Sequence, residues 1–187
     1  SLHDALPIYF PEKKYEGYIF DLDGTLVDSM PLHYKAWRKA LARAGAPDRV
    51  FLADEFYSCG GKSANDVVRF LNERYGMHMD AASTAADKRR IYLEMLEKEG
   101  MQPIREVVEF VHSLGDAPKA IATGSAMPGA SRTLAAAGLS GLFDVILTPD
   151  EVEHGKPAPD MFLKAAELLG VSPDRCVVFE DAEPGMG

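Results

Sequence analysis

The stretch YIFDLDGTLVDS, residues 18–29, places three apolar residues in a row directly before a group of aspartates. Short apolar runs without polar alternation are typical of central strands that are covered on both faces. Similar runs occur at 119–124 (KAIATG), 143–148 (FDVILT) and 175–181 (RCVVFED). The segments 126–138 and 158–170, which lie between them, have apolar residues at helical spacing and end in glycine. This alternation predicts an α/β fold with a parallel, doubly wound sheet.

The segment 31–103 follows a different pattern, because it contains no comparable strand run. Helical stretches dominate it, at 32–45, 63–76 and 85–100. The segment 104–115 then returns the chain to the sheet, with Val107, Val108, Val111 and Leu114 on one helical face. We therefore expect a core formed by residues 16–30 and 104–187, split by a helical cap at 31–103.

The first residues of the chain do not continue this pattern. Residues 1–15 are expected to form an N-terminal extension, and its ALPI segment (5–8) resembles the translation of a common sequencing-adapter DNA. We hypothesise that residues 1–8 are an artefact of that origin, and they do not enter the fold prediction.

The composition excludes several classes of protein. With 187 residues, 47% of them hydrophobic, the chain can form one domain or one domain with an insertion. A net charge of −9 with interspersed Lys and Arg disfavours nucleic acid as a partner. Cys59 and Cys176 lack metal-ligand spacing, so we expect free thiols in a reducing compartment. No apolar stretch approaches the ~20 residues of a membrane span, and no signal-like segment is present. We expect a cytoplasmic monomer without a membrane partner.

Polar side chains follow the predicted strands where each strand ends. They are Asp21 and Asp23, Thr123 and Ser125, and Glu180 and Asp181, while Lys156 precedes the helical segment near 158. In an open parallel sheet these positions converge on one crevice. Four acids in one place would repel one another unless a cation lies among them. Mg²⁺ fits best, since it prefers a few carboxylates, water and a substrate phosphate.

This set of side chains suits phosphoryl transfer. Asp21 and Asp23 would share one side of an extended chain. One carboxylate could attack phosphorus and form an aspartyl phosphate, while Asp23 would act as general acid and base. The Thr123 hydroxyl and the Lys156 charge are groups that hold phosphoryl oxygens.

Each motif also has a plain structural interpretation. The DxDG segment could be an ordinary turn, TGS a turn with a capping hydroxyl, and the acids at 180–181 helix caps. Lys156 could be a surface lysine held extended by Pro157. The order of all four motifs, each at the end of the right kind of element, favours the catalytic interpretation.

Four motifs, FDLDGTL, IATGS, GKPAPD and VVFEDAEPG, resemble those of the haloacid dehalogenase superfamily, over about residues 16–187. The insertion resembles the helical cap of the subgroup that includes β-phosphoglucomutase and sugar-phosphate phosphatases. The resemblance implies Asp21 as nucleophile and Asp23 as acid/base, the residue that dehalogenases lack. It implies phosphate binding by Thr123, Gly124, Ser125 and Lys156. It further implies Mg²⁺ held by the Asp21 side chain, the Asp23 carbonyl, Asp181 and, directly or through water, Glu180.

The cap offers two groups of candidates for substrate binding. His33 and Trp37 lie one helical turn apart, and each either borders the substrate pocket or only packs and bonds within the cap. In CGGKSAND (59–66), Gly61 permits close backbone approach, Lys62 could meet an anionic substrate, and Ser63 is predicted to cap a helix.

Mutase-like relatives carry an arginine after this loop. Here Ala64 and Asn65 stand at that place and Arg69 lies about one turn further on, which favours a phosphatase. Asp28, beside the expected hinge at 29–31, is predicted to have no catalytic role.

The family continues beyond the last motif with a helix and a strand, so the C-terminal part of the core is expected to be missing. The prediction is a Mg²⁺-dependent phosphomonoester hydrolase acting on a small phosphorylated metabolite, a sugar phosphate, through an aspartyl phosphate. A hexose-phosphate mutase and a non-catalytic fragment are the alternatives.

Overall fold

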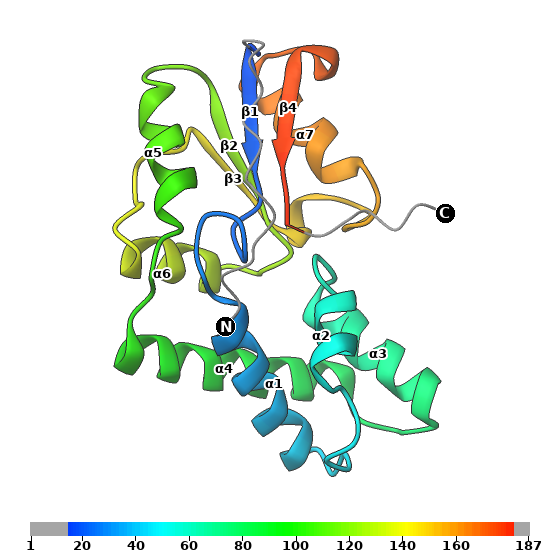
Figure 1. Ribbon diagram of the computed structural model, residues 1–187. Coiled ribbons are helices and arrows are strands. Elements are labelled where there is room, and N and C mark those ends of the chain that lie inside the picture. The colour runs from blue at the N-terminus through cyan, green and yellow to red at the C-terminus, as the bar shows by residue number, and fades with distance from the viewer. Residues whose placement is uncertain (1–14, 182–187) are drawn as a thin grey trace.

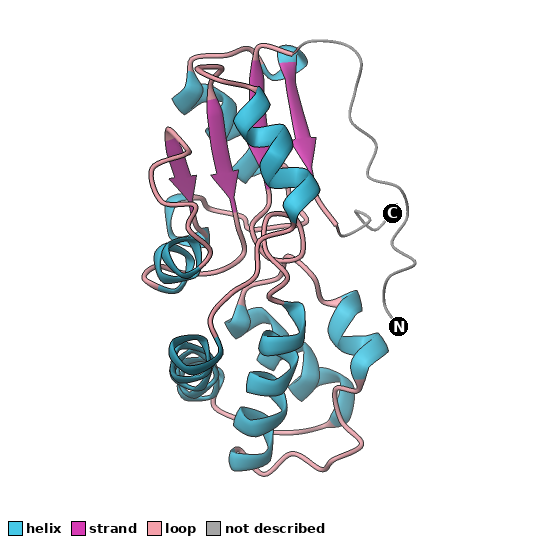
Figure 2. Ribbon diagram, turned by 60° about the vertical axis from the view of Figure 1, so that its left-hand side comes forward, coloured by secondary structure: helices cyan, strands magenta, loops and turns pink. Residues whose placement is uncertain are grey.

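The computed structural model describes residues 15–181, so the hypothesis about residues 1–8 lies outside the described residues. Its centre is a parallel sheet of four strands in the order β3-β2-β1-β4 (Figures 1 and 2). The strands are β1 (Gly17–Phe20), β2 (Lys119–Ala122), β3 (Val145–Leu147) and β4 (Cys176–Phe179). In register, Ile19 lies opposite Ala120 on one side and Val178 on the other.

Helices cover both faces of the sheet because the side chains of β1 alternate between them. Tyr18 and Phe20 pack in the cluster that contains residues of α5 (Arg105–Ser113) and α6 (Gly129–Ala136). Ile19 points the other way, into the cluster formed with α7 (Asp160–Leu169). Two short 3₁₀ helices, η1 (Pro149–Glu151) and η2 (Pro173–Arg175), lie in the connections. The predicted α/β, doubly wound fold class is confirmed.

The insertion between β1 and α5 consists of helices that form a separate lobe below the sheet (Figure 1). They are α1 (Met30–Arg43), α2 (Ala53–Ser58), α3 (Ala64–Tyr75) and α4 (Ala81–Glu99). Trp37, Phe51 and Leu71 belong to a hydrophobic cluster of this lobe. The sequence did not predict α2, whose six residues are too few to show a periodic pattern.

Two chain crossings connect the lobes, and they pair with each other. Asp28 N donates to Gln102 O at 3.0 Å, and Ile104 N donates to Leu26 O at 2.9 Å. The Asp28 side chain is exposed, so its predicted absence from the catalytic group agrees with its place at the crossing.

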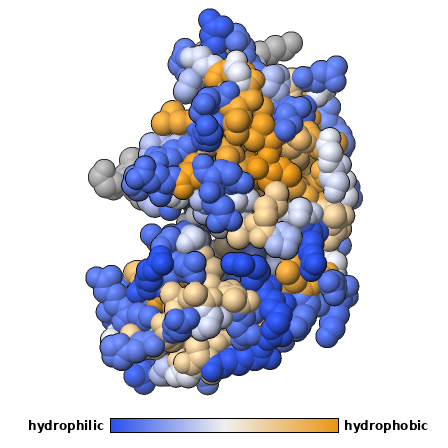
Figure 3. Space-filling view, turned by 180° about the vertical axis from the view of Figure 1, so that it is seen from behind, coloured by the Kyte–Doolittle hydropathy of each residue, from blue (hydrophilic) through white to orange (hydrophobic). Residues whose placement is uncertain are grey.

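The surfaces of the two lobes differ. Seen from behind, apolar residues gather on the core lobe, whereas the cap lobe is mainly hydrophilic (Figure 3). Among residues 15–181 no helix is long and apolar enough to cross a membrane.

Candidate active site

The carboxyl ends of the strands meet at the edge of the sheet that faces the cap. A cavity of about 340 Å³ lies there, and both lobes line it. Eight of the predicted site residues line this cavity: Asp21, Asp23, Gly124, Ser125, Asp181, His33, Gly61 and Lys62. Thr123 contacts Asp23 and Lys156 contacts Asp21 of this set, while Glu180 pairs with Lys156. The structure therefore brings the predicted residues of both lobes to one place.

Asp21 is held at the end of β1 by its backbone, since its N–H donates to Phe179 O at 2.9 Å. The side chain is only 4% exposed. Its Oδ1 lies 3.1 Å from Lys156 Nζ, but among residues 15–181 no donor makes a well-aligned hydrogen bond to this oxygen. Burial raises the pKa of Asp21 to about 7, against the charge of Lys156 and with a further contribution from Asp23. Asp21 thus offers a buried carboxylate oxygen without a hydrogen-bond donor, as a nucleophile or metal ligand requires.

Asp23, two residues later, has the opposite surroundings. Ser29 Oγ and His33 Nε2 donate to its Oδ1 at 2.6 and 2.9 Å. Ser125 Oγ donates to Oδ2 at 2.6 Å, and Thr123 Oγ1 lies 3.5 Å from the same oxygen. Burial works to raise the pKa of Asp23, but His33 and the two serine hydroxyls outweigh it and hold this pKa below its usual range. The structure therefore favours the ionised form of Asp23.

The cap supplies a chain of contacts that leads to Asp23. Lys88 Nζ lies 2.8 Å from His33 Nδ1, and the His33 ring stacks on Tyr92 with centroids 4.1 Å apart. Burial, together with the Lys88 charge, lowers the pKa of His33 and favours the neutral ring. Since a lysine ammonium can only donate, Nδ1 accepts and Nε2 carries the proton that is donated to Asp23. Lys88 therefore fixes the tautomer of the histidine that orients Asp23.

The sequence interpretation missed Ser29, Lys88 and Tyr92. It left open whether His33 bonds locally or borders the pocket. In the structure His33 lines the cavity, and its Nε2 also reaches Asp23 of the core. A signal for Lys88 exists, because it shares a face of α4 with the buried Ile91 and Tyr92, and a charged residue on such a face requires a partner. Trp37 is 4% exposed and meets the Phe51 ring edge-on at 5.5 Å, so its main contacts are packing contacts, although it also lines the cavity.

The sequence predicts four neighbouring acids, but in the structure Lys156 lies between two of them, Asp21 and Glu180. Its Nζ is 2.9 Å from Glu180 Oε1 and 3.1 Å from Asp21 Oδ1. Within residues 15–181 no three acidic, histidine or cysteine side chains are close enough to bind a metal ion by themselves. The predicted ligand set does not need three side chains, since Asp23 contributes its backbone carbonyl.

The donors present nevertheless fit Mg²⁺. Asp21 Oδ1 is buried without a hydrogen bond, and burial raises the pKa of Asp181, with a contribution from Glu180. Both are carboxylates, the hard oxygen ligands that this ion prefers. A Cβ placed on Gly24 would lie 2.1 Å from Asp181 Oδ2, so the absence of a side chain there is what makes room for this carboxylate.

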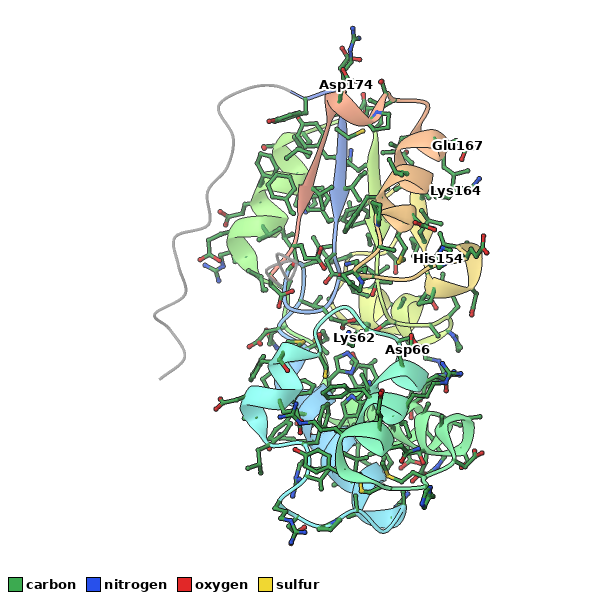
Figure 4. The ribbon with its side chains drawn as sticks, turned by 90° about the vertical axis from the view of Figure 1, so that its right-hand side faces the viewer. Lys62, Asp66, His154, Lys164, Glu167 and Asp174 are labelled. Atoms are coloured by element: carbon green, nitrogen blue, oxygen red, sulfur yellow. The ribbon has the colours of Figure 1, made fainter. Side chains whose placement is uncertain are left out.

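The loop before α3 closes the cavity from the cap side. A Cβ on Gly124 would lie 2.6 Å from Gly61 O, and a Cβ on Gly61 would lie 3.2 Å from Lys156 Cδ. The two backbones therefore touch, as the predicted role of Gly61 requires. Figure 4 shows Lys62 and Asp66 at the end of the cap that faces the core. Ser63 caps α3 as predicted, accepting from Asp66 N at 3.2 Å.

Comparison with known proteins identifies the class of this chain. The family model for haloacid dehalogenase-like hydrolases matches residues 15–187. The chain therefore belongs to the haloacid dehalogenase-like hydrolases, and the predicted enzyme class, a phosphatase of this family, is confirmed.

Several relatives carry names that describe phosphorylated sugars. The chain is 36% identical to fructose-1-phosphate phosphatase YqaB of Escherichia coli, over 93% of this chain and 90% of the relative. It is 35% identical to hexitol phosphatase A of the same organism, over 91% and 76%. The β-phosphoglucomutase structure from Clostridium difficile superimposes with a TM-score of 0.75 at 26% identity, over 92% of this chain and 78% of the other.

Proposed function

We propose that this chain hydrolyses phosphate monoesters of small sugars or sugar alcohols, with Mg²⁺ and an aspartyl-phosphate intermediate. The observation that carries the proposal is the contrast between two aspartates in one cavity. Asp21 presents an oxygen to which no group in the described part of the chain donates a hydrogen bond, whereas Asp23 accepts from hydroxyls and an imidazole. Two carboxyl groups with opposite surroundings suit two different roles.

In the first step Asp21 Oδ attacks phosphorus, and the bond between phosphorus and the ester oxygen breaks. Lys156 Nζ, beside Asp21, supports the negative charge at the site. When bound, Mg²⁺ supplies further positive charge for the phosphoryl oxygens. The Asp21 side chain, the Asp23 carbonyl and Asp181 would hold it, with Glu180 acting directly or through water.

Asp23 handles the proton in both steps. The leaving oxygen takes a proton from Asp23. In the second step Asp23 takes a proton from the water that attacks the aspartyl phosphate, the bond between phosphorus and Asp21 Oδ breaks, and inorganic phosphate leaves. The hydrogen bonds of the closed structure favour the ionised form, which suits the second step. The protonated form is favoured when a donor withdraws. His33 is the donor that belongs to the cap, so we infer that movement of the cap away from the core helps Asp23 to take up a proton again.

The substrate class is inferred from the relatives and from the cavity. A volume of about 340 Å³ falls in the range of pockets for small molecules. Names of relatives such as fructose-1-phosphate phosphatase and hexitol phosphatase support a sugar or sugar-alcohol phosphate. Cys59 and Cys176 are free thiols in the structure, which agrees with a reducing compartment such as the cytoplasm.

A mutase of the β-phosphoglucomutase type is the second candidate. The chain is 34% identical to a β-phosphoglucomutase of Mycobacterium bovis. Such an enzyme has to hold a second phosphate. Arg69, the first arginine after the loop at 59–63, borders the cavity, but it is largely exposed and pairs with Asp66 at 2.8 Å. This pairing favours the phosphatase.

A substrate panel tests the proposal. Fructose 1-phosphate, hexitol phosphates and β-glucose 1-phosphate are incubated with the protein, with Mg²⁺ or with EDTA. We expect Mg²⁺-dependent release of inorganic phosphate from at least one sugar or hexitol phosphate. Conversion of β-glucose 1-phosphate into glucose 6-phosphate without free phosphate would favour the mutase. No turnover of any compound would favour the non-catalytic fragment.

A further inference from the structure

A second contact between the lobes joins α4 of the cap to α6 of the core, through Tyr92, which also lines the cavity. The Tyr92 hydroxyl and Thr133 Oγ1 are 2.8 Å apart, and either can be the donor. Tyr92 is 3% exposed and Thr133 is 1% exposed. A buried hydrogen bond of this kind is costly to break, because no water replaces the lost partner. It can form only when α4 lies against α6.

The same tyrosine touches the site through its ring. The rings of Tyr92 and His33 are stacked at an interplanar angle of 9°, and Lys88 Nζ lies 5.4 Å from the centre of the Tyr92 ring. The face of Tyr92 thus limits the plane in which the His33 ring can turn. That plane decides whether Nε2 points at Asp23 Oδ1, which it reaches at 2.9 Å.

We propose that Tyr92 is a positioning residue, anchored on Thr133 of the core, that sets the orientation of His33 and so of the proton-transferring Asp23. The hydroxyl of Tyr92 bonds to Thr133 of the core, and its ring stacks on His33, so the position of α4 against α6 fixes the orientation of the His33 ring. This proposal rests on the proposed function, because Asp23 is taken as the acid/base. Thr133 acts only through Tyr92.

The hydroxyl separates this role from simple packing, because Tyr92→Phe keeps the ring and removes only the anchor. Thr133→Val removes the other half of the bond with little change of shape. In p-nitrophenyl phosphate hydrolysis with Mg²⁺, we expect each variant to lower kcat about tenfold. We expect KM to change less than about twofold, because the loss concerns the reaction step. The double variant should resemble each single variant.

Two further variants serve as controls. Thr133→Ser keeps a hydroxyl and should restore most of kcat. Ser131→Ala removes an exposed hydroxyl from the same helix, one that donates to Pro128 O at 2.9 Å, and should leave kcat unchanged. Unchanged kcat in folded Tyr92→Phe and Thr133→Val, or additive losses in the double variant, would overturn the proposal.

A readout without turnover separates this proposal from the proposed function. Nitrogen-15 spectra of labelled histidine, with His33 assigned by comparison with His33→Gln, report the ring tautomer. We expect one fixed Nε2–H tautomer in the wild-type protein and a mixture in Tyr92→Phe and Thr133→Val, because a ring that turns leaves both Lys88 Nζ and Asp23 Oδ1. If that change occurs but the wild-type protein hydrolyses no phosphate, the proposed function fails and the positioning role stands. An unchanged His33 signal in both variants contradicts the positioning role.

Discussion

The cavity has two sides, which differ in how their side chains are held: a core wall, formed by residues at the strand ends, and a cap wall, formed by residues of the cap helices. Asp21 and Thr123 directly follow strands, and their backbone N–H groups bond to Phe179 O and Leu147 O of neighbouring strands. His33 projects from α1 and reaches Asp23 of the core through its side chain, and Lys88 of α4 contacts His33. The core wall is therefore fixed by the sheet, whereas the cap wall is in place only when the cap is seated. We expect loss of a core group to stop the reaction and loss of a cap group to slow it.

The largest effect is expected from Asp21→Asn. The amide keeps the shape of the side chain but is a poor nucleophile, so turnover of a sugar phosphate should fall by more than roughly 10³-fold. Phosphate release under saturating Mg²⁺ measures the change. Wild-type turnover in a folded Asp21→Asn protein would contradict the claim that loss of a core group stops the reaction.

Gly24→Ala should come next, because it disturbs the core wall without removing a reacting group. The new Cβ would meet Asp181 Oδ2, and Gly24 has φ +86°, where a side chain costs about 1 kcal/mol or more. We expect a weaker Mg²⁺ response, measured as the Mg²⁺ concentration that gives half of full activity.

Gly138→Ala is the matched control for Gly24→Ala. Its φ of +73° carries a similar backbone strain, but a Cβ there meets no atom of residues 15–181 within 4 Å. It should lower the unfolding temperature while leaving the Mg²⁺ response unchanged. Equal Mg²⁺ responses in both variants would show that Asp181 is not displaced.

Lys88→Met tests the cap wall. The methionine fills similar space without the donor that fixes His33, so we expect kcat to fall roughly tenfold, or about 1.4 kcal/mol of transition-state stabilisation. Arg90→Met, on the same helix but paired with Asp87 and Glu94 at the surface, should keep wild-type kcat. A loss of kcat as large as that of Asp21→Asn would contradict the claim that the cap residues only orient Asp23.

The smallest effect concerns stability without metal. The pKa of Asp21 rises from 3.8 to about 7 on folding, so the folded state binds this proton more tightly. Its contribution to stability is present below about pH 4 and is lost as the pH rises to about 7. In EDTA, Asp21→Asn should therefore gain stability relative to the wild-type protein between these pH values, by urea unfolding. A constant difference across this range would contradict the raised pKa.

The sequence predicted the core wall well because its residues are local to strand ends. A parallel sheet brings such ends together whatever the loops do, so Asp21, Ser125 and Asp181 could be placed without coordinates. The pairing of Lys156 with Glu180 could not, because it depends on side-chain packing between distant segments.

The cap wall could be predicted only in part. The glycine approach and the Ser63 cap follow from local rules. Tyr92 and Lys88 lie 59 and 55 positions from His33, and only the docking of α4 against α1 brings the three together. No local pattern specifies which face of α4 docks, and so the partners of His33 were missed.

The most direct test is to find the phosphoryl group on the protein. The wild-type protein is mixed with a hydrolysed sugar phosphate and Mg²⁺, quenched in acid during turnover, digested and examined by mass spectrometry, with Asp21→Asn as control. We predict a phosphoryl group on Asp21 in the wild-type protein alone. Turnover with no phosphorylated Asp21 at any quench time, or with the phosphoryl group on another residue, would contradict the assignment of Asp21 as nucleophile.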